Sequence, residues 1–321
     1  MKKKLTIALA LVLIVASITM NVVLTILLVG AGNKNRHMKQ ENSKLLAQVI
    51  SFGTGQTMSW KSKEDFEKKA RLYRRDFVSH HDFEPDSYVL SPPVIPPSNN
   101  QYTLLVYLHG MGSNYMEPYI MAKKEPIVKS IQESYPGFIF ASLSFGKESA
   151  WGNEKSVQDI NQNISELTHA YPVHNIVLMG SSMGGCVALN YAAIAPAQIR
   201  KRITGVVSVE SSGDIAKVYT LTKEGVVKLG IMNAMGGSPE QKPDAYRAAS
   251  LLDHLNEVPR GVKFSIVSAR KDKTVPVELQ KNLVEELTKN GYENKLFEVD
   301  IAHEFPSAAT YIEALDFVMQ K

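Results

Sequence analysis

Residues 176–185 read IVLMGSSMGG, an apolar run that ends in Gly180-Ser181-Ser182-Met183-Gly184. A helical pattern follows at once and continues to Ala195. A serine with a glycine two positions away on each side, between a strand and a helix, is typical of a tight turn that exposes the serine hydroxyl. Glycine is needed because a Cβ atom at either position would collide with the neighbouring backbone. The pattern predicts that Ser182 is a nucleophile; the alternative is a glycine-rich turn that only caps a helix.

A serine nucleophile needs a base and an orienting acid, because its hydroxyl is weakly nucleophilic at neutral pH. His303 follows the strand-like run 296–299, and Asp272 follows the strand-like run 262–268. The carboxyl ends of parallel strands meet at one edge of a sheet. We therefore expect His303 and Asp272 beside Ser182, in the chain order serine, acid, histidine.

Glu210 is the alternative acid, because it ends the predicted strand 205–209 and a carboxylate there can also reach a catalytic histidine. The expected order and placement favour Asp272. Five other histidines have no strand-end position that pairs with Ser182 and are interpreted as structural or surface residues. They are His80, His81, His169, His174 and His254.

Stabilising the oxyanion of an acyl-transfer reaction requires backbone N–H donors beside the nucleophile. One donor is expected from the residue after Ser182, and a second from a loop that follows an earlier strand. The sequence HGMGS at residues 109–113 follows the apolar run 102–108 and fits this second position. The predicted donors are the N–H groups of Met111 and Met183. The alternative for this loop is an ordinary turn whose His109 packs under the sheet.

Apolar runs that alternate with helical patterns indicate an α/β fold, a mostly parallel sheet with helices on both faces. The predicted strands are 102–108, 138–143, 175–179, 205–209, 262–268 and 296–299. The predicted helices are 156–170, 184–195, 277–290 and 308–320.

These motifs resemble those of the α/β-hydrolase superfamily, within it the branch of prolyl-oligopeptidase-like and dienelactone-hydrolase-like serine hydrolases. The resemblance covers residues 102–321. It implies Ser182 as nucleophile, His303 as general base and acid, Asp272 as orienting carboxylate, and neither a metal nor an organic cofactor. Peptidases of this branch carry an N-terminal propeller, for which the region before Tyr102 is too short, so the resemblance favours an esterase.

The resemblance also assigns a domain organisation, with a catalytic domain over residues 101–321. Residues 211–259 stand where such hydrolases insert a cap over the active site. Apolar residues there, such as Met232 and Met235, either line an acyl-binding surface or form ordinary helix core.

The N-terminal region predicts a membrane anchor. Lys2, Lys3 and Lys4 precede an uncharged run over residues 5–32, which exceeds the roughly 20 residues that span a bilayer as a transmembrane helix. The alternative is a signal peptide cleaved near Gly30-Ala31-Gly32, followed by secretion. With one anchor ahead of a large domain, we expect the catalytic part to be extracytoplasmic.

Residues 33–100 are interpreted as a linker that includes an amphipathic helix over 60–77, because apolar residues recur there at helical spacing.

The amino-acid composition of the chain excludes several classes of partner and site. The chain has 321 residues, 44% hydrophobic and 21% charged, which is typical of a globular protein with a sizeable core. A net charge of +4 without a basic stripe makes nucleic acid a poor partner. The single cysteine, Cys186, excludes an intramolecular disulfide and a cysteine-based zinc site.

Together these features predict a membrane-anchored serine hydrolase that cleaves carboxylic esters through an acyl-enzyme intermediate. A peptidase or amidase with the same triad is the second hypothesis, and a non-catalytic binding module is the third. Acyl transfer to an acceptor other than water stays open.

Overall fold

The computed structural model describes residues 73–120 and 126–320. The predicted anchor over residues 1–32 therefore lies outside the described residues, as does the first part of the predicted linker. Within the described ranges, no helix is both long and apolar enough to cross a membrane.

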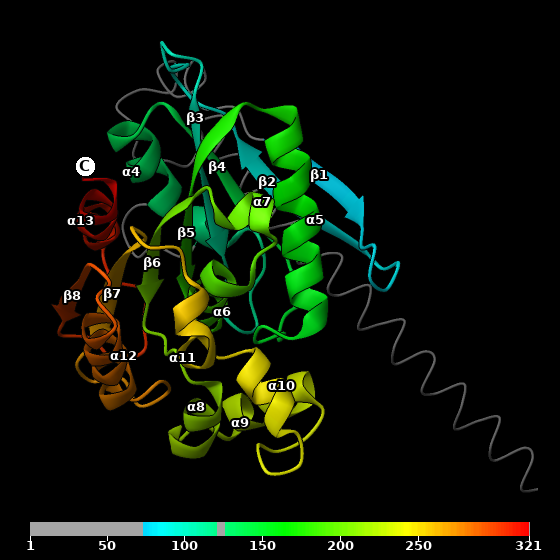
Figure 1. Ribbon diagram of the computed structural model, residues 1–321, viewed down its shortest axis with the longest axis vertical. Coiled ribbons are helices and arrows are strands. Elements are labelled where there is room, and N and C mark those ends of the chain that lie inside the picture. The colour runs from blue at the N-terminus through cyan, green and yellow to red at the C-terminus, as the bar shows by residue number, and fades with distance from the viewer. Residues whose placement is uncertain (1–72, 121–125, 321) are drawn as a thin grey trace, which may run out of the picture. The chain divides into compact units, whose positions relative to one another are not determined.

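Eight strands form one sheet in the order β1-β2-β4-β3-β5-β6-β7-β8 (Figure 1). The strands are β1 Tyr73–Val78, β2 Pro85–Ser91, β3 Tyr102–Leu108, β4 Phe138–Leu143, β5 Val173–Ser181, β6 Ile203–Val209, β7 Lys263–Ala269 and β8 Asn294–Val299. Neighbours from β4 to β8 are parallel, whereas β2 runs antiparallel to both β1 and β4. The predicted mostly parallel sheet is confirmed.

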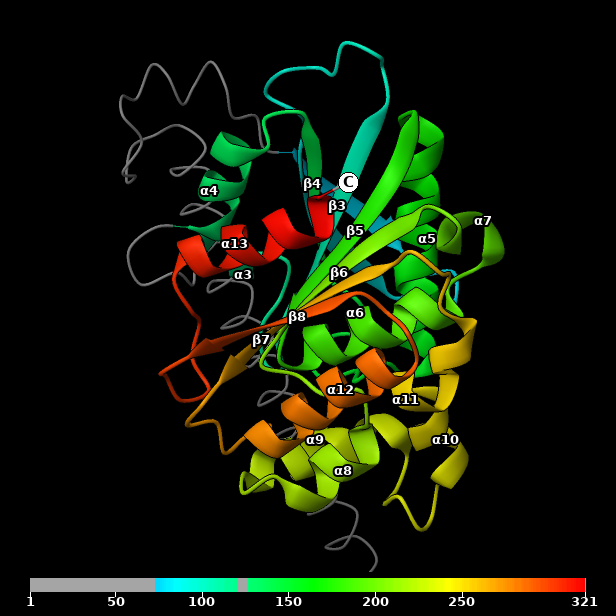
Figure 2. The same cartoon turned by 60° about the vertical axis from the view of Figure 1, so that its left-hand side comes forward.

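Helices cover both faces of this sheet. The longer ones are α4 Ile127–Ser134, α5 Glu154–Ala170, α6 Met183–Ile194, α12 Val277–Lys289 and α13 Ala308–Met319. Helices α4 and α13 pack together on one face, and α5, α6 and α12 lie on the other (Figure 2). Enclosure on both sides explains why every residue from Leu104 to Leu108 in β3 has no exposed surface.

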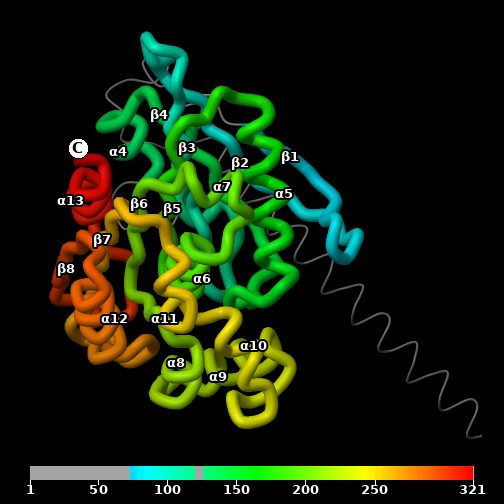
Figure 3. The backbone as a smooth tube through the Cα atoms, in the orientation of Figure 1, coloured from blue at the N-terminus to red at the C-terminus, as the bar shows by residue number. Residues whose placement is uncertain are grey.

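Short helices fill most of the segment between β6 and β7. They are α8 Ile215–Leu221, α9 Gly225–Met235, α10 Pro243–Ala248, α11 Leu251–His254 and the 3-10 turn Leu255–Glu257. The tube in Figure 3 shows α8, α9 and α10 gathered beyond the carboxyl ends of the central strands. Two other short helices are α3 Glu117–Ile120 and α7 Ala197–Arg200.

The six predicted strands and four predicted helices form within about two residues of the expected bounds. The predicted helix over 60–77 is wrong in its last part, because residues 73–78 form strand β1. Tyr73 and Phe77 fit helical spacing as well as the two-residue alternation of a strand, and pairing with β2 selects the strand.

The boundary expected near residue 101 also differs from the structure. Strand β2 ends at Ser91, before the prolines, and pairs with β4 over Tyr88 to Ser91. The sheet therefore begins well before Tyr102. Its buried apolar run is only Tyr88-Val89-Leu90, which is too short to stand out in the sequence.

Candidate active site

The turn from β5 to α6 holds Ser182 in an unusual backbone conformation, with φ 53° and ψ −120°. A non-glycine residue in this region is strained, and such strain is concentrated at functional sites. A Cβ atom at Gly180 would lie 2.4 Å from the Gly184 backbone, and one at Gly184 would lie 2.0 Å from the Leu108 carbonyl oxygen. Glycine is therefore required at both flanking positions.

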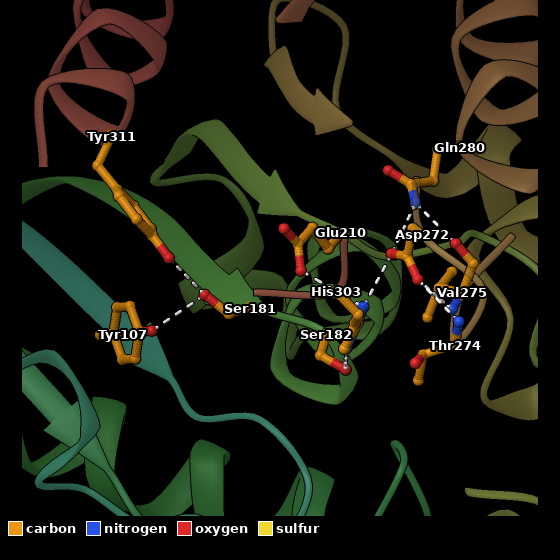
Figure 4. Close-up of polar contacts among 10 residues, drawn as sticks. All are labelled: Tyr107, Ser181, Ser182, Glu210, Asp272, Thr274, Val275, Gln280, His303 and Tyr311. Atoms are coloured by element: carbon orange, nitrogen blue, oxygen red, sulfur yellow. Dashed lines mark hydrogen bonds and ion pairs between the residues drawn. The ribbon is translucent and has the colours of Figure 1, made fainter. Parts of the chain in front are cut away.

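Three side chains from three strand ends meet at this turn (Figure 4). His303 Nε2 lies 2.8 Å from Ser182 Oγ, and His303 Nδ1 lies 2.8 Å from Asp272 Oδ2. Ser182 follows β5, Asp272 follows β7 and His303 follows β8. The structure thus brings together the three residues predicted as nucleophile, base and acid, although they span more than a hundred positions of the chain.

Asp272 is held in place by further hydrogen bonds. Its Oδ1 accepts the backbone N–H groups of Thr274 and Val275 at 2.8 and 2.9 Å, and its Oδ2 accepts Gln280 Nε2 at 3.1 Å. These donors fix the direction of the Asp272 side chain toward His303. Nothing in the sequence motifs pointed to Gln280, which reaches the acid from α12.

Glu210 is the second carboxyl group near His303, and its Oε2 lies 3.4 Å from His303 Nδ1. This is longer than the 2.8 Å contact of Asp272, so Asp272 is the better placed acid. Glu210 Oε1 has no hydrogen-bond partner among the described residues. Burial, followed by the negative charge of Asp272, raises the pKa of Glu210 to about 9. At neutral pH Glu210 is therefore a neutral carboxylic acid.

Glu210, Asp272 and His303 are also the kind of residues that bind metal ions, and their ligand atoms lie within 4.8 Å of one another. Both Asp272 oxygens, however, already accept hydrogen bonds from the protein, and Asp272 Oδ2 lies within hydrogen-bonding distance of His303 Nδ1. This pattern fits an orienting acid better than a metal ligand.

Two backbone N–H groups are available beside Ser182. Neither Met111, after β3, nor Met183, the first residue of α6, donates its backbone N–H to another described residue. The glycine before Met111 lies close to the nucleophile, since a Cβ atom at Gly110 would be 3.7 Å from Ser182 Cβ. The two predicted oxyanion donors therefore lie in segments that adjoin Ser182.

His109 and Cys186 take no part in this arrangement. His109 is buried against Phe145, with ring centroids 4.6 Å apart, and burial lowers its pKa to about 4. The alternative interpretation of loop 109–113, an ordinary turn whose His109 packs under the sheet, is consistent with this buried position. Burial raises the pKa of the Cys186 thiol to about 12, so Cys186 is not a nucleophile at neutral pH.

Helix α9 packs close to Met111, in the loop predicted to supply an oxyanion donor. A Cβ atom at Gly230 would lie 2.6 Å from Met111 Sδ and 2.8 Å from Ser149 Oγ. The segment predicted to form a cap thus reaches the site through a glycine that permits close approach. Next to Ser182 and His303 a cavity of about 50 Å³ is lined by Glu210, Phe305 and other side chains.

The comparisons with known proteins agree with this architecture. Residues 103–236 match the family model described as alpha/beta hydrolase fold. The chain has the α/β-hydrolase fold. A comparison with curated proteins gives no match.

Several solved structures are similar to this chain, each at low sequence identity. An acylaminoacyl peptidase complexed with Z-Gly-Gly-Phe-chloromethyl ketone has a TM-score of 0.61 and 15% identity, covering 79% of this chain and 42% of its own. A puromycin hydrolase has a TM-score of 0.61 and 19% identity, and the match covers 78% of this chain and 39% of the puromycin hydrolase. Our chain therefore spans less than half the length of these two proteins.

The fluorophosphonate-binding serine hydrolase F of Staphylococcus aureus, solved with bound substrate, has a TM-score of 0.60 at 12% identity. The match covers 78% of this chain and 99% of that protein. The α/β-hydrolase fold of our chain thus corresponds to almost all of that protein and to one part of the longer peptidases.

Proposed function

We propose that this protein is a serine hydrolase that cleaves carboxylic esters through an acyl-enzyme intermediate on Ser182. The observation that carries the proposal is the continuous contact from Ser182 Oγ through His303 to Asp272, with 2.8 Å at each step. This order of nucleophile, base and acid is that of a catalytic triad.

In the first half of the reaction, Ser182 Oγ attacks the ester carbonyl carbon while His303 Nε2 takes the hydroxyl proton. The carbonyl oxygen becomes an oxyanion, which the N–H groups of Met111 and Met183 stabilise. His303 then gives its proton to the departing alcohol, and the acyl group stays on Ser182. Asp272 stabilises the imidazolium and holds the ring in position.

In the second half, a water molecule takes the place of the alcohol. His303 removes a proton from the water as its oxygen attacks the acyl carbon, and the same N–H groups receive the new oxyanion. Collapse of this intermediate returns the proton to Ser182 Oγ and releases the carboxylic acid. Neither half requires a metal or an organic cofactor.

An ester is proposed ahead of a peptide because an alcohol leaves more readily than an amine, which His303 must protonate as it departs. A peptidase with the same triad is the second candidate, because acylaminoacyl peptidases are among the solved structures with a similar fold. Parallel assays with p-nitrophenyl esters and with aminoacyl p-nitroanilides distinguish the two activities.

The test of catalysis is covalent labelling of the full-length chain by a fluorophosphonate. We expect the wild type to label and Ser182→Ala and His303→Ala to lose labelling. Ser238→Ala and His254→Ala are matched controls, because both residues lie outside the triad. A folded wild type that neither labels nor hydrolyses esters would instead indicate a binding module.

Membrane anchoring through residues 5–32 is part of the same proposal and rests on sequence alone. Fractionation of cells that express the full chain should leave labelled protein in the membrane pellet after a high-salt wash. Addition of protease outside intact cells should then cleave an extracytoplasmic catalytic domain.

A further inference from the structure

A second buried carboxyl group, Glu117, contacts the oxyanion loop. Glu117 begins α3 and is 1% exposed. Its Oε1 and Oε2 accept the backbone N–H of Gly110 at 3.2 and 3.0 Å, and Oε1 also accepts the Tyr107 hydroxyl at 2.8 Å. Glu117 thus binds both the end of β3 and the loop that follows it.

These contacts determine which amide of the loop can serve an oxyanion. The Gly110 N–H is occupied by Glu117, and the Gly112 N–H donates to the Glu148 carbonyl oxygen at 2.8 Å. Met111 lies between these two fixed amides, and its own N–H has no partner among the described residues. The loop is therefore held on both sides of the Met111 N–H, the predicted oxyanion donor.

The same hydrogen-bond network reaches the nucleophile from a second direction. Tyr107 Oη lies 3.1 Å from Ser181 Oγ, which lies 2.9 Å from Tyr311 Oη (Figure 4). Ser181 directly precedes Ser182, and all three linked side chains are buried. Glu117 therefore joins the oxyanion loop to the backbone that presents the nucleophile.

The environment of Glu117 favours the neutral form of its carboxyl group. Within the part of the chain that the structure describes, Glu117 forms no ion pair with a cation. Burial raises the pKa of Glu117 to about 7, although hydrogen bonds from Tyr107, Ser113 and Gly110 act in the opposite direction. What the buried carboxyl group supplies to its surroundings is two oxygen atoms that accept hydrogen bonds from Gly110 and Tyr107.

We propose that Glu117 is a positioning residue that holds the Gly110 amide so that the Met111 N–H is directed at the oxyanion. The inference rests on the proposed hydrolase function. Glu117 itself touches no substrate and acts through the loop. Its loss should weaken transition-state stabilisation more than substrate binding, since oxyanion donors act mainly in the transition state.

The test compares Glu117→Ala and Glu117→Gln in the full-length chain, with kcat calculated per site titrated by a fluorophosphonate. We expect Glu117→Ala to lower kcat by about 30-fold or more while KM changes less than about threefold. Glu117→Gln keeps an acceptor for the Gly110 N–H, and its kcat should stay within about fivefold of the wild type.

Ser91→Ala is the matched control. Ser91 Oγ lies 2.8 Å from the hydroxyl of Tyr119, which is on the same short helix as Glu117 but outside the loop network. This variant removes a buried hydrogen bond from α3 and should leave kcat per site unchanged. A Glu117→Ala variant with kcat per site equal to that of Ser91→Ala would overturn the proposal.

Two further outcomes keep the proposals distinct. A folded wild type that does not label removes the proposed function, whatever Glu117 does. If Glu117→Ala does not fold, Tyr107→Phe takes its place, because it removes one donor to Glu117 and leaves the Gly110 contact. We then expect kcat per site to fall by about threefold to tenfold, and an unchanged kcat would contradict the network.

Discussion

His303 Nδ1 lies 2.8 Å from Asp272 Oδ2, and His303 Nε2 on the other side of the ring lies 2.8 Å from Ser182 Oγ. Glu210 approaches the same nitrogen at 3.4 Å but is kept neutral, since burial and the charge of Asp272 raise its pKa to about 9. Two carboxyl groups thus face one histidine, and the environment of Glu210 keeps that group uncharged at neutral pH.

We expect Asp272→Asn to lower kcat by about 10⁴-fold, because the asparagine amide stabilises the wrong tautomer of His303. Glu210→Gln preserves the shape of a neutral carboxyl group and should change kcat by less than about threefold. Steady-state ester hydrolysis at pH 7 measures both. The reverse ranking of these two variants would make Glu210 the triad acid.

The double variant Asp272→Asn with Glu210→Gln tests whether Glu210 can replace the lost acid. In Asp272→Asn the negative charge beside Glu210 is gone, which lowers the pKa of Glu210 toward its ordinary range. Residual activity of the single variant should then depend on Glu210 and fall by about tenfold or more in the double variant. Additive losses in the double-mutant cycle would show that Glu210 does not replace the lost acid.

Stability should depend on pH through Glu117. Its pKa is raised from 4.5 to about 7, so the native state holds the proton more strongly than the unfolded chain does. This contribution is fully present below about pH 4.5 and is lost as pH rises through about 7. We expect a loss of about 3 kcal/mol over this window, which Glu117→Gln removes.

Denaturant unfolding of the wild type and Glu117→Gln at pH 5 and pH 8 measures the effect. The wild type should lose unfolding free energy between pH 5 and pH 8, and Glu117→Gln should not. Relative to the wild type, the glutamine variant should therefore be more stable at pH 8 than at pH 5. A difference that is the same at both pH values would mean that Glu117 does not titrate in this range.

The tight turn at Ser182 can be tested by comparing Gly184 with Gly225, a glycine in open space. Gly184→Ala places a Cβ atom 2.0 Å from the Leu108 carbonyl oxygen, and backbone atoms there cannot move easily. We expect a loss of about 3 kcal/mol or more in unfolding free energy. Gly225→Ala meets no atom within 4 Å and should change stability by less than about 1 kcal/mol. Equal stabilities of the two variants would contradict the close packing of the turn from β5 to α6.

The approach of α9 to the oxyanion loop predicts a functional effect of Gly230→Ala. The added Cβ atom would displace Met111 Sδ, a flexible side chain, so stability should fall by only about 1 kcal/mol. The Met111 backbone moves with it, and kcat/KM should fall by about tenfold. Gly225→Ala, on the same helix, serves as the control, and an equal kcat/KM in both variants would show that α9 does not influence the loop.

The parts of the fold and site that sequence predicted are those that local chemistry specifies. The sequence predicts strands β3 and β4 at their observed bounds, because strands buried on both faces are continuous apolar runs. That Asp272 and His303 lie beside Ser182 follows from one topological fact, that parallel strands bring their carboxyl ends to one edge. The two-residue glycine spacing needed only the steric demand of a tight turn.

Other features depended on contacts between distant segments. Residues 73–78 carry apolar side chains that suit a helix or a strand, and only hydrogen bonding to β2 selects the strand. The choice between Asp272 and Glu210 is a difference between 2.8 and 3.4 Å, which no spacing along the chain encodes. Glu117 is one acidic residue among many in the sequence, and it gains its contact with Gly110 only when α3 folds back on the loop. Burial and hydrogen-bond partners are properties of the packed chain, so the charges and the exact geometry of the site required the tertiary structure.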